Sequence, residues 1–135
     1  MTIQELSRLR ALSKLIERER EKLEELRAAA VNTSPRLDGM PHGSGPHDKI
    51  GDLTVRIVDQ EGQILQHIRQ YYAEWERITA WINNVSDPRI RLICLLRFSD
   101  GLPWERVADR IGGRETSNAA INALRRYLAA EKEGG

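Results

Sequence analysis

Apolar residues near the start of the chain recur at alternating intervals of three and four. They are Leu9, Leu12, Ile16, Leu23, Leu26 and Ala30, with Glu19 as a polar member of the same series. Residues 2–31 contain no Gly or Pro, and most of them favour helix. The pattern predicts one helix of about thirty residues, about 45 Å long, with a narrow apolar face. Because such a face is buried only against another helix, the first helix requires a partner.

A second series with the same spacing follows a break. Residues 32–48 hold three prolines and three glycines in seventeen positions, a composition that regular elements do not tolerate. From about Asp48 to Asn84 the three-four rhythm resumes, with Gly62 inside it at a cost of about 1 kcal/mol relative to Ala. A glycine inside a helix often marks a close approach of another helix, or a slight bend. We therefore expect residues 1–84 to form an antiparallel helical hairpin with its loop at 32–48.

The remainder of the chain predicts three short helices and a fraying tail at 133–135. Ser86-Asp87-Pro88 is a helix start, and the next helix, which contains Ile93 and Phe98, is apolar nearly all round. A helix beginning near Trp104 ends at Gly112-Gly113, and Thr116 or Ser117 caps the last one. Aromatic residues make up only 5% of the chain and charged residues 30%, which favours an all-α fold over a β-sandwich.

The last two short helices, joined by a glycine turn, are arranged in sequence as a helix-turn-helix. Ala108 is the small residue that a close helix crossing needs. The polar face of the last helix offers Arg114, Ser117, Asn118, Asn122, Arg125 and Arg126, together with Glu115. Asn and Arg make the two-point contacts to adenine and guanine in the major groove. We expect residues 85–132 to form a helix-turn-helix module that binds double-stranded DNA through this last helix.

The charge distribution agrees with that placement. The net charge of +1 argues against a chain that coats nucleic acid along its length. Residues 89–135, however, hold nine Lys or Arg against six Asp or Glu, whereas residues 1–88 hold 12 against 14. A local surplus of +3 is compatible with a protein that binds one short DNA site. The alternative is a helical scaffold or adaptor whose partner is another protein, with ordinary solvated charges.

The segment from Leu102 to Gly113, LPWERVADRIGG, with Arg125-Arg126-Tyr127-Leu128 after it, resembles the DNA-binding region 4 of sigma-70-type factors. With the loop at 39–45, nearly the whole chain is similar to small sigma-factor-like regulators encoded by phages and prophages of Gram-positive bacteria. The resemblance implies DNA binding and control of phage transcription in the bacterial cytoplasm, and host RNA polymerase as a candidate partner. The chain departs from region 4 at Ala119-Ala120, where a β-branched residue is usual.

We expect a homodimer through residues 2–31 and 50–82, because a two-helix hairpin alone leaves apolar edges exposed and a dimer would present two recognition helices. The tryptophans Trp75, Trp81 and Trp104 are expected to pack between the hairpin and the short helices. No apolar run is long enough to span a membrane.

Residues with catalytic or ligand potential have simpler interpretations. Asp38, His42, His47 and Asp48 lie in a Pro/Gly turn without a defined metal geometry, so we expect no metal or cofactor. His67 is expected at the polar edge of its helix, and Cys94 as a small buried apolar residue. Nothing in the sequence suggests a catalytic constellation, and we expect no enzyme activity.

Overall fold

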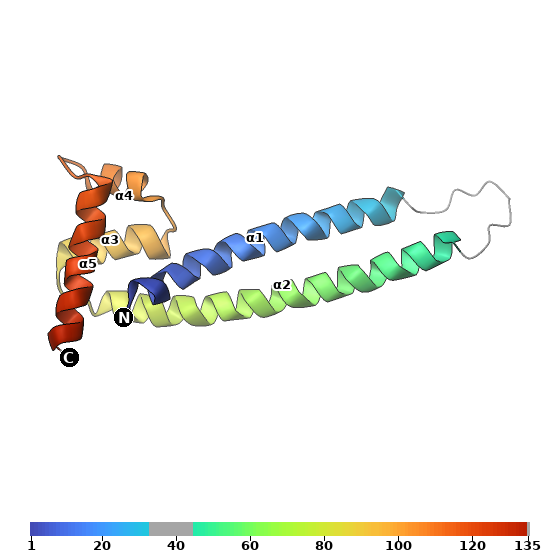
Figure 1. The fold of residues 1–135 in the computed structure, drawn as a ribbon, viewed down its shortest axis with the longest axis horizontal. Helices are drawn as coiled ribbons and strands as arrows, with labels where there is room; N and C mark the ends of the chain where they lie inside the picture. Colours follow the sequence, from blue (N-terminus) through green and yellow to red (C-terminus); the bar gives the residue numbers. More distant parts are fainter. Residues whose placement is uncertain (33–44, 135) are drawn as a thin grey trace. The chain divides into compact units, whose positions relative to one another are not determined.

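The computed structural model of the protein describes residues 1–32 and 45–134, except for the side chains of residues 45–48. This part of the chain is helical and contains no strand, which confirms the all-α fold (Figure 1). The elements are α1 (Ile3–Asn32), α2 (Gly45–Asn83), α3 (Pro88–Cys94), the π-helical segment η1 (Leu95–Ser99), α4 (Trp104–Ile111) and α5 (Ser117–Gly134). The last helix continues to Gly134, so Glu133 and Gly134, which were expected to fray, are helical, and Gly135 lies outside the described residues. The polar loop residues Asp38 and His42, and the side chains of His47 and Asp48, lie outside the described residues.

Two compact units divide the chain. One consists of Met1–Leu12 together with Tyr71–Gly135, and the other of Ser13–Gln70. The sequence suggested a division at 84/85, between the hairpin and the short helices. Packing divides the chain elsewhere, because the first turns of α1 and the end of α2 share a core with the short helices.

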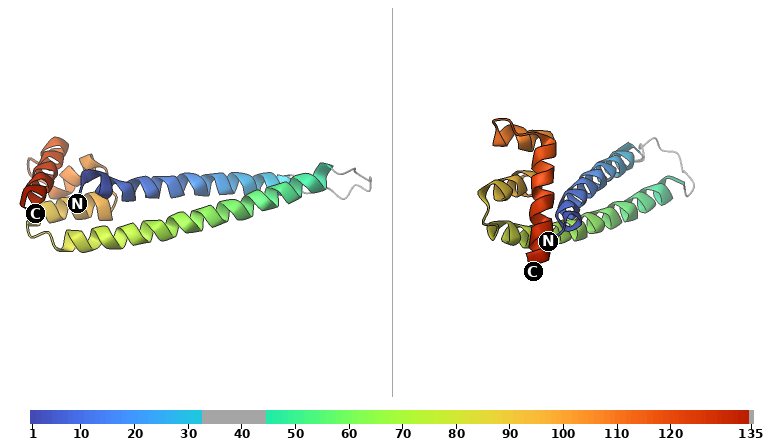
Figure 2. Two further views of the ribbon diagram at one scale, coloured as in Figure 1. Left: turned by 60° about the horizontal axis from the view of Figure 1, so that its bottom comes forward. Right: turned by 60° about the vertical axis from the view of Figure 1, so that its left-hand side comes forward.

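The Ser13–Gln70 unit pairs the second part of α1 with the first part of α2. The two segments run antiparallel: Glu19 contacts His67, whereas Arg27, further along α1, contacts Glu61, which comes earlier in α2 (Figure 2). Ile16 and Leu23 from α1 and Ile64 from α2 are buried. The three-four series of each helix thus forms the contact face, as the sequence predicts.

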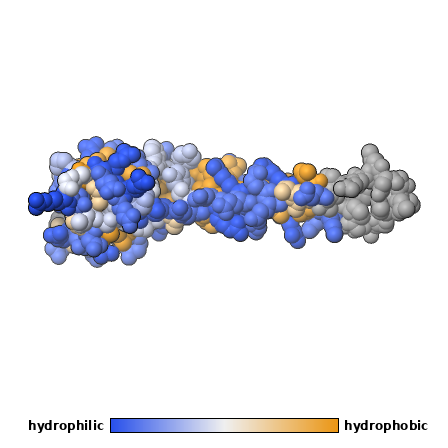
Figure 3. All heavy atoms as spheres, turned by 90° about the horizontal axis from the view of Figure 1, so that it is seen from above, coloured by the Kyte–Doolittle hydropathy of each residue, from blue (hydrophilic) through white to orange (hydrophobic). Residues whose placement is uncertain are grey.

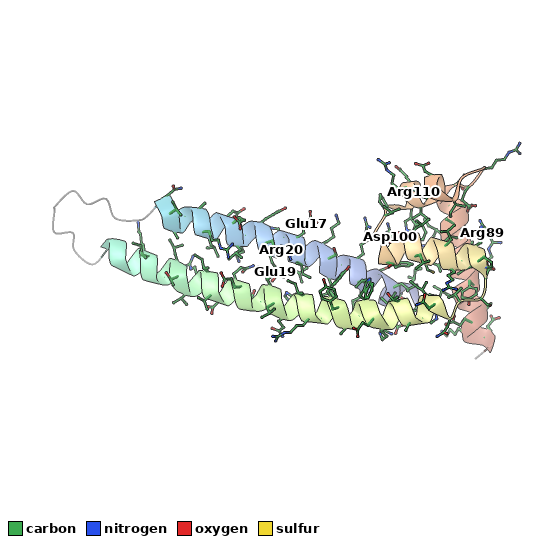
Figure 4. The ribbon with its side chains drawn as sticks, turned by 180° about the vertical axis from the view of Figure 1, so that it is seen from behind. Glu17, Glu19, Arg20, Arg89, Asp100 and Arg110 are labelled. Atoms are coloured by element: carbon green, nitrogen blue, oxygen red, sulfur yellow. The ribbon has the colours of Figure 1, made fainter. Side chains whose placement is uncertain are left out.

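One layer of this contact face is polar. Glu19 and Gln60 are buried, at 8% and 6% exposure. The Glu19 carboxylate lies 2.6 Å from Nδ1 of His67, and the side-chain amide of Gln60 donates to the backbone oxygen of Glu19 at 3.1 Å. In Figure 4 Glu19 lies on the side of α1 that faces α2, whereas Glu17 lies on the outside. His67, expected at the polar edge of its helix, is half-buried with its side chain 28% exposed, and its ring pairs with Glu19.

The other unit has a single apolar core built from all six elements. Leu6 and Leu9 of α1, Ile78 and Ile82 of α2, and the buried faces of the short helices belong to the same cluster. Ion pairs border the α1–α2 contact, with Arg77 bound to Glu5 at 3.3 Å and to Glu74 at 3.0 Å. Packing of this kind stabilises helices that would be only marginally stable on their own.

Local hydrogen bonds cap α1 and α3 at the residues where the sequence predicts that these helices begin. The backbone N–H groups of Arg89 and Ile90 donate to the Asp87 carboxylate at 2.9 and 3.2 Å, and Pro88 occupies the first turn. At the start of α1, Thr2 and Glu5 bond reciprocally as a capping box. The bond from the Thr2 N–H lowers the pKa of Glu5, because it favours the ionised carboxylate.

The loop between η1 and α4 is held by two arginines. Arg97 donates to the backbone oxygen of Leu102 at 3.0 Å, and Arg10 donates to that of Gly101 at 2.8 Å. The Arg97 guanidinium also lies over the Trp104 ring, 4.8 Å from its centroid. These contacts tie α1 and η1 to the residues directly before α4, and so fix where α4 begins.

The tryptophans pack inside this unit as expected. Trp104 makes an edge-to-face contact with Phe98, and Trp81 with Tyr127 of α5. The Trp81 indole N–H also donates to Glu131 at 3.1 Å, and this contact holds the later part of α5 against α2. Trp75 is half-buried against the same core.

Candidate nucleic-acid interface

Helices α4 and α5 are joined by a turn that depends on two glycines. Gly112 has a φ of 80° and Gly113 a φ of 65°, a region that L side chains adopt at a cost. The Gly112 N–H donates to the Ala108 oxygen at 3.0 Å and closes α4, and the Gly112 oxygen accepts from the Glu115 N–H at 3.3 Å. The turn therefore changes the direction of the chain within a few residues, and α5 packs against α4.

Thr116 is the residue that caps α5. Its side-chain oxygen accepts from the Ala119 N–H at 3.1 Å, and its backbone oxygen from the Ala120 N–H at 3.0 Å. Of the two candidate caps in the sequence, the structure thus selects Thr116, and Ser117 becomes the first residue of the helix. This register determines which side chains of α5 face outward.

The inner face of α5 is apolar and fully packed. Ala120 and Leu124 have no exposed surface, and Leu128 is 8% exposed. Val107 and Ala108 of α4 are buried in the same unit, so the small residue expected at the helix crossing is indeed inside. Burial at every fourth residue, at Ala120, Leu124 and Leu128, fixes the rotation of α5 about its axis.

The outer face of α5 carries the polar residues singled out in the sequence. Asn118, Asn122 and Arg125 are exposed and follow one another at intervals of four and three, which places them in one row along the helix. Arg126 is exposed beside that row, and its Nε donates to the Asn122 backbone oxygen at 3.3 Å. Arg114 is exposed in the turn, whereas Ser117 is half-buried.

An ion pair that has no signal in the local sequence anchors the turn. Arg89, in the first turn of α3, lies 2.6 Å from the Glu115 carboxylate, whose side chain is only 12% exposed. The two residues are 26 positions apart, so only the folded chain brings them together. Sequence reasoning placed Glu115 on the outer face of the last helix. In the structure its charge is neutralised by Arg89 instead.

This pairing concentrates positive charge on the turn and α5. Within the described chain, Arg114, Arg125 and Arg126 form no ion pair. The exposed face of α4 is balanced, with Arg106 and Arg110 beside Glu105 and Asp109. Figure 4 shows Arg110 on α4 and Arg89 near the start of α5. The surplus of positive charge therefore lies on the row of Asn and Arg side chains.

Arg125 borders a second feature of the surface. An open groove of about 460 Å³ lies between the first residues of the chain and α5, and Met1, Ile3 and Leu128 contribute apolar walls. A substitution of Arg125 thus alters both the row of Asn and Arg side chains on α5 and this groove. Arg126 does not line the groove, which makes it the more selective position for substitution.

The remaining candidate groups have structural roles. Cys94 is buried as expected, and burial raises the pKa of its thiol to about 12, which leaves it protonated at neutral pH. Among the described residues, no group of three His, Cys, Asp or Glu side chains could hold a metal ion. No helix in the described ranges is both long and apolar enough to cross a membrane.

Comparisons with protein-family models, with curated proteins and with solved structures found no match for the chain. The described residues form an all-α fold in which α1 and α2 are antiparallel and the last helix, α5, exposes a row of Asn and Arg side chains.

Proposed function

We propose that the protein is a sequence-specific DNA-binding regulator of transcription, of phage origin, that acts in the cytoplasm of a bacterial host. The observation that carries the proposal is the exposed row of Asn118, Asn122 and Arg125, with Arg126 beside it, on a helix whose inner face is fully packed. A helix about 10–12 Å across fits the major groove, and Asn and Arg recognise adenine and guanine edges there.

The turn supplies contacts of a different kind. Arg114 and Ser117 stand at the start of α5, where the helix dipole and free N–H groups favour a phosphate. In this proposal these residues position the protein on the DNA backbone, and the Asn and Arg row reads the bases. Residues 1–84 serve as the arm for dimer assembly or for contact with host RNA polymerase.

Binding of fluorescent duplex DNA, followed by anisotropy at two salt concentrations, tests the proposal. With roughly four phosphate contacts, we expect affinity to fall about a hundred-fold between about 50 and 200 mM salt. The Arg125→Glu, Arg126→Glu double variant should lose binding. A double reversal on the exposed face of α1, Arg20→Glu with Lys22→Glu, changes the net charge equally and should retain it.

The outcomes separate the two classes of function. Equal losses in both double variants would assign any binding to net charge alone and contradict a recognition role for α5. Absent or salt-independent binding would instead favour a helical scaffold or adaptor for another protein. A search for a preferred sequence among fragments of the protein's own genome then tests specificity, because the proposed regulator retains particular fragments above random duplex.

A further inference from the structure

Helix α2 carries a second apolar row that α1 does not cover. Val55, Val58 and Leu65 are 59%, 60% and 49% exposed, although large apolar side chains are usually buried. With Gly62 and Arg69 they are spaced by three, four, three and four residues, which places all five on one face of the helix. We call Val55, Val58, Gly62, Leu65 and Arg69 the outer row. Figure 3, which looks from above Figure 1, shows that apolar patches also interrupt the hydrophilic surface elsewhere along the long helices.

The outer row is distinct from the face that pairs with α1. In the Ser13–Gln70 unit, the buried or half-buried residues of α2 follow a separate series, which includes Leu53, Ile57 and Ile64. At 100° per residue the two series lie about 150° apart around the helix. α1 therefore cannot cover both, and the outer row needs a different partner.

Gly62 points to the same conclusion. A glycine inside a helix costs about 1 kcal/mol relative to Ala. A Cβ built at Gly62 would meet nothing within 4 Å, so packing against α1 does not require glycine there. The bend or close approach expected from the sequence is thus not explained within one chain. A helix that packs on the outer row from another molecule would explain it.

We propose that the outer row binds the outer row of a second copy of this chain, with the two α2 helices antiparallel about a twofold axis between Gly62 and Leu65. The spacing between Val58, Gly62, Leu65 and Arg69 is four, three and four, which is the same in both directions. Two copies can therefore align with Gly62 opposite the partner's Leu65 and Val58 opposite the partner's Arg69. A small residue then faces a large one in each central layer, as close packing requires.

Charge supports antiparallel self-pairing. Asp59 follows Val58 directly, so Arg69 of one copy would come to lie beside Asp59 of the other. Within the described residues neither Asp59 nor Arg69 forms an ion pair in the single chain. They are ten positions apart on one helix and cannot reach each other. A twofold pair provides the contact twice, whereas a parallel pair in register would place Arg69 against Arg69.

The inference rests on the proposed function only for the existence of a dimer, and it does not require DNA binding. Sedimentation velocity of the full chain should give twice the 15.4 kDa mass of one chain. Leu65→Glu should weaken the dimer at least about tenfold, because it places a carboxylate in the apolar layer. Gln63→Glu, an exposed position of the same helix outside the outer row, should leave the dimer intact.

Cross-linking tests the direction of pairing. A short bismaleimide should join a Val58→Cys chain to an Arg69→Cys chain far more than either to itself, whereas a parallel dimer would join Val58→Cys chains to each other. The native Cys94 is buried and does not compete. A wild-type monomer at all concentrations, or a dimer unaffected by Leu65→Glu, would overturn the proposal. Circular dichroism of the same variants shows whether a lost dimer reflects lost folding. DNA anisotropy of the same variants tests the DNA-binding proposal separately, so failure of one proposal is distinguished from failure of the other.

Discussion

The pair formed by Glu19 and His67 shows how single residues select the alignment of two helices. Glu19 occupies a position of the apolar series of α1 and, although polar, is buried there. Its carboxylate bonds to His67, and its backbone oxygen accepts a hydrogen bond from Gln60. A one-turn slip of α2 would separate the carboxyl group of Glu19 from the imidazole and leave a buried polar group without its partner. A buried polar group of this kind specifies register at a cost in stability.

Removal of one partner should therefore cost more than removal of both. We expect His67→Leu to lower the free energy of unfolding by about 1–3 kcal/mol, because Glu19 remains buried without its partner. The Glu19→Leu, His67→Leu double variant should regain most of that loss, since two leucines fill an apolar layer. Urea unfolding of the wild type, both single variants and the double variant measures the coupling. If the losses in unfolding free energy of the two single variants add up to that of the double variant, the contact between Glu19 and His67 contributes nothing to stability.

Cys94 allows a test of burial by chemistry. Its pKa is raised from 9.0 to about 12, so at a given pH below 9 the reactive thiolate is about a thousand-fold rarer than in the unfolded chain. Iodoacetamide at about pH 8 should label the native protein far more slowly than the protein in urea. The raised pKa also implies a stability contribution that is complete below pH 9.0 and is lost as the pH rises towards about 12. Rapid native labelling would contradict this placement of α3.

The cap of α5 sets the residue at which the helix begins, and with it the orientation of the outer face. Thr116→Ala should cost about 1 kcal/mol, because the Ala119 N–H loses its acceptor. Ser117→Ala is the matched control, since Ser117 lies inside the helix and alanine is the better helix former there. Thermal unfolding of both variants measures the difference. A larger loss from Ser117→Ala would move the start of α5 by one residue and rotate Asn118 and Asn122 with it.

Most elements were predictable because their signals are local. The absence of Gly and Pro from residues 2–31 corresponds to α1, and the Asp87-Pro88 and Gly112-Gly113 pairs mark observed helix limits. The exposure of Asn118, Asn122, Arg125 and Arg126 also followed from helical periodicity. The sequence predicts that the second helix begins at about Asp48, whereas α2 begins three residues earlier, at Gly45. A Gly-Pro pair is an ambiguous signal, because proline is compatible with the first turn of a helix.

Contacts between distant residues were not predictable. Arg89 and Glu115 are separated by 26 positions, and nothing near either residue indicates the other. The pairing of His67 with Glu19 could not be predicted for the same reason: periodicity describes one helix, whereas a contact depends also on the rotation and register of its partner. Helix periodicity also could not show that Leu6 and Leu9 share a core with α3, α4 and α5.

The shared core makes the short helices dependent on the ends of α1 and α2 that belong to the same unit. Leu6, Leu9, Ile78 and Ile82 are at most 2% exposed and pack in the same cluster as Ile93 and Leu124. The positively charged segment 89–135 is thus one part of a compact unit that also includes Met1–Leu12.

The dependence can be measured with two leucines on the same helix. Leu9→Ala removes a buried side chain from the core that contains α3–α5 and should cost about 2–5 kcal/mol. Amide hydrogen exchange throughout α3–α5 should then accelerate by about tenfold or more, since 1.4 kcal/mol already corresponds to tenfold. Leu23→Ala, the same change in the Ser13–Gln70 unit, should accelerate exchange in its own unit and leave α3–α5 protected. If Leu9→Ala also left α3–α5 unaffected, residues 85–132 would fold as an independent module, as the sequence alone suggested.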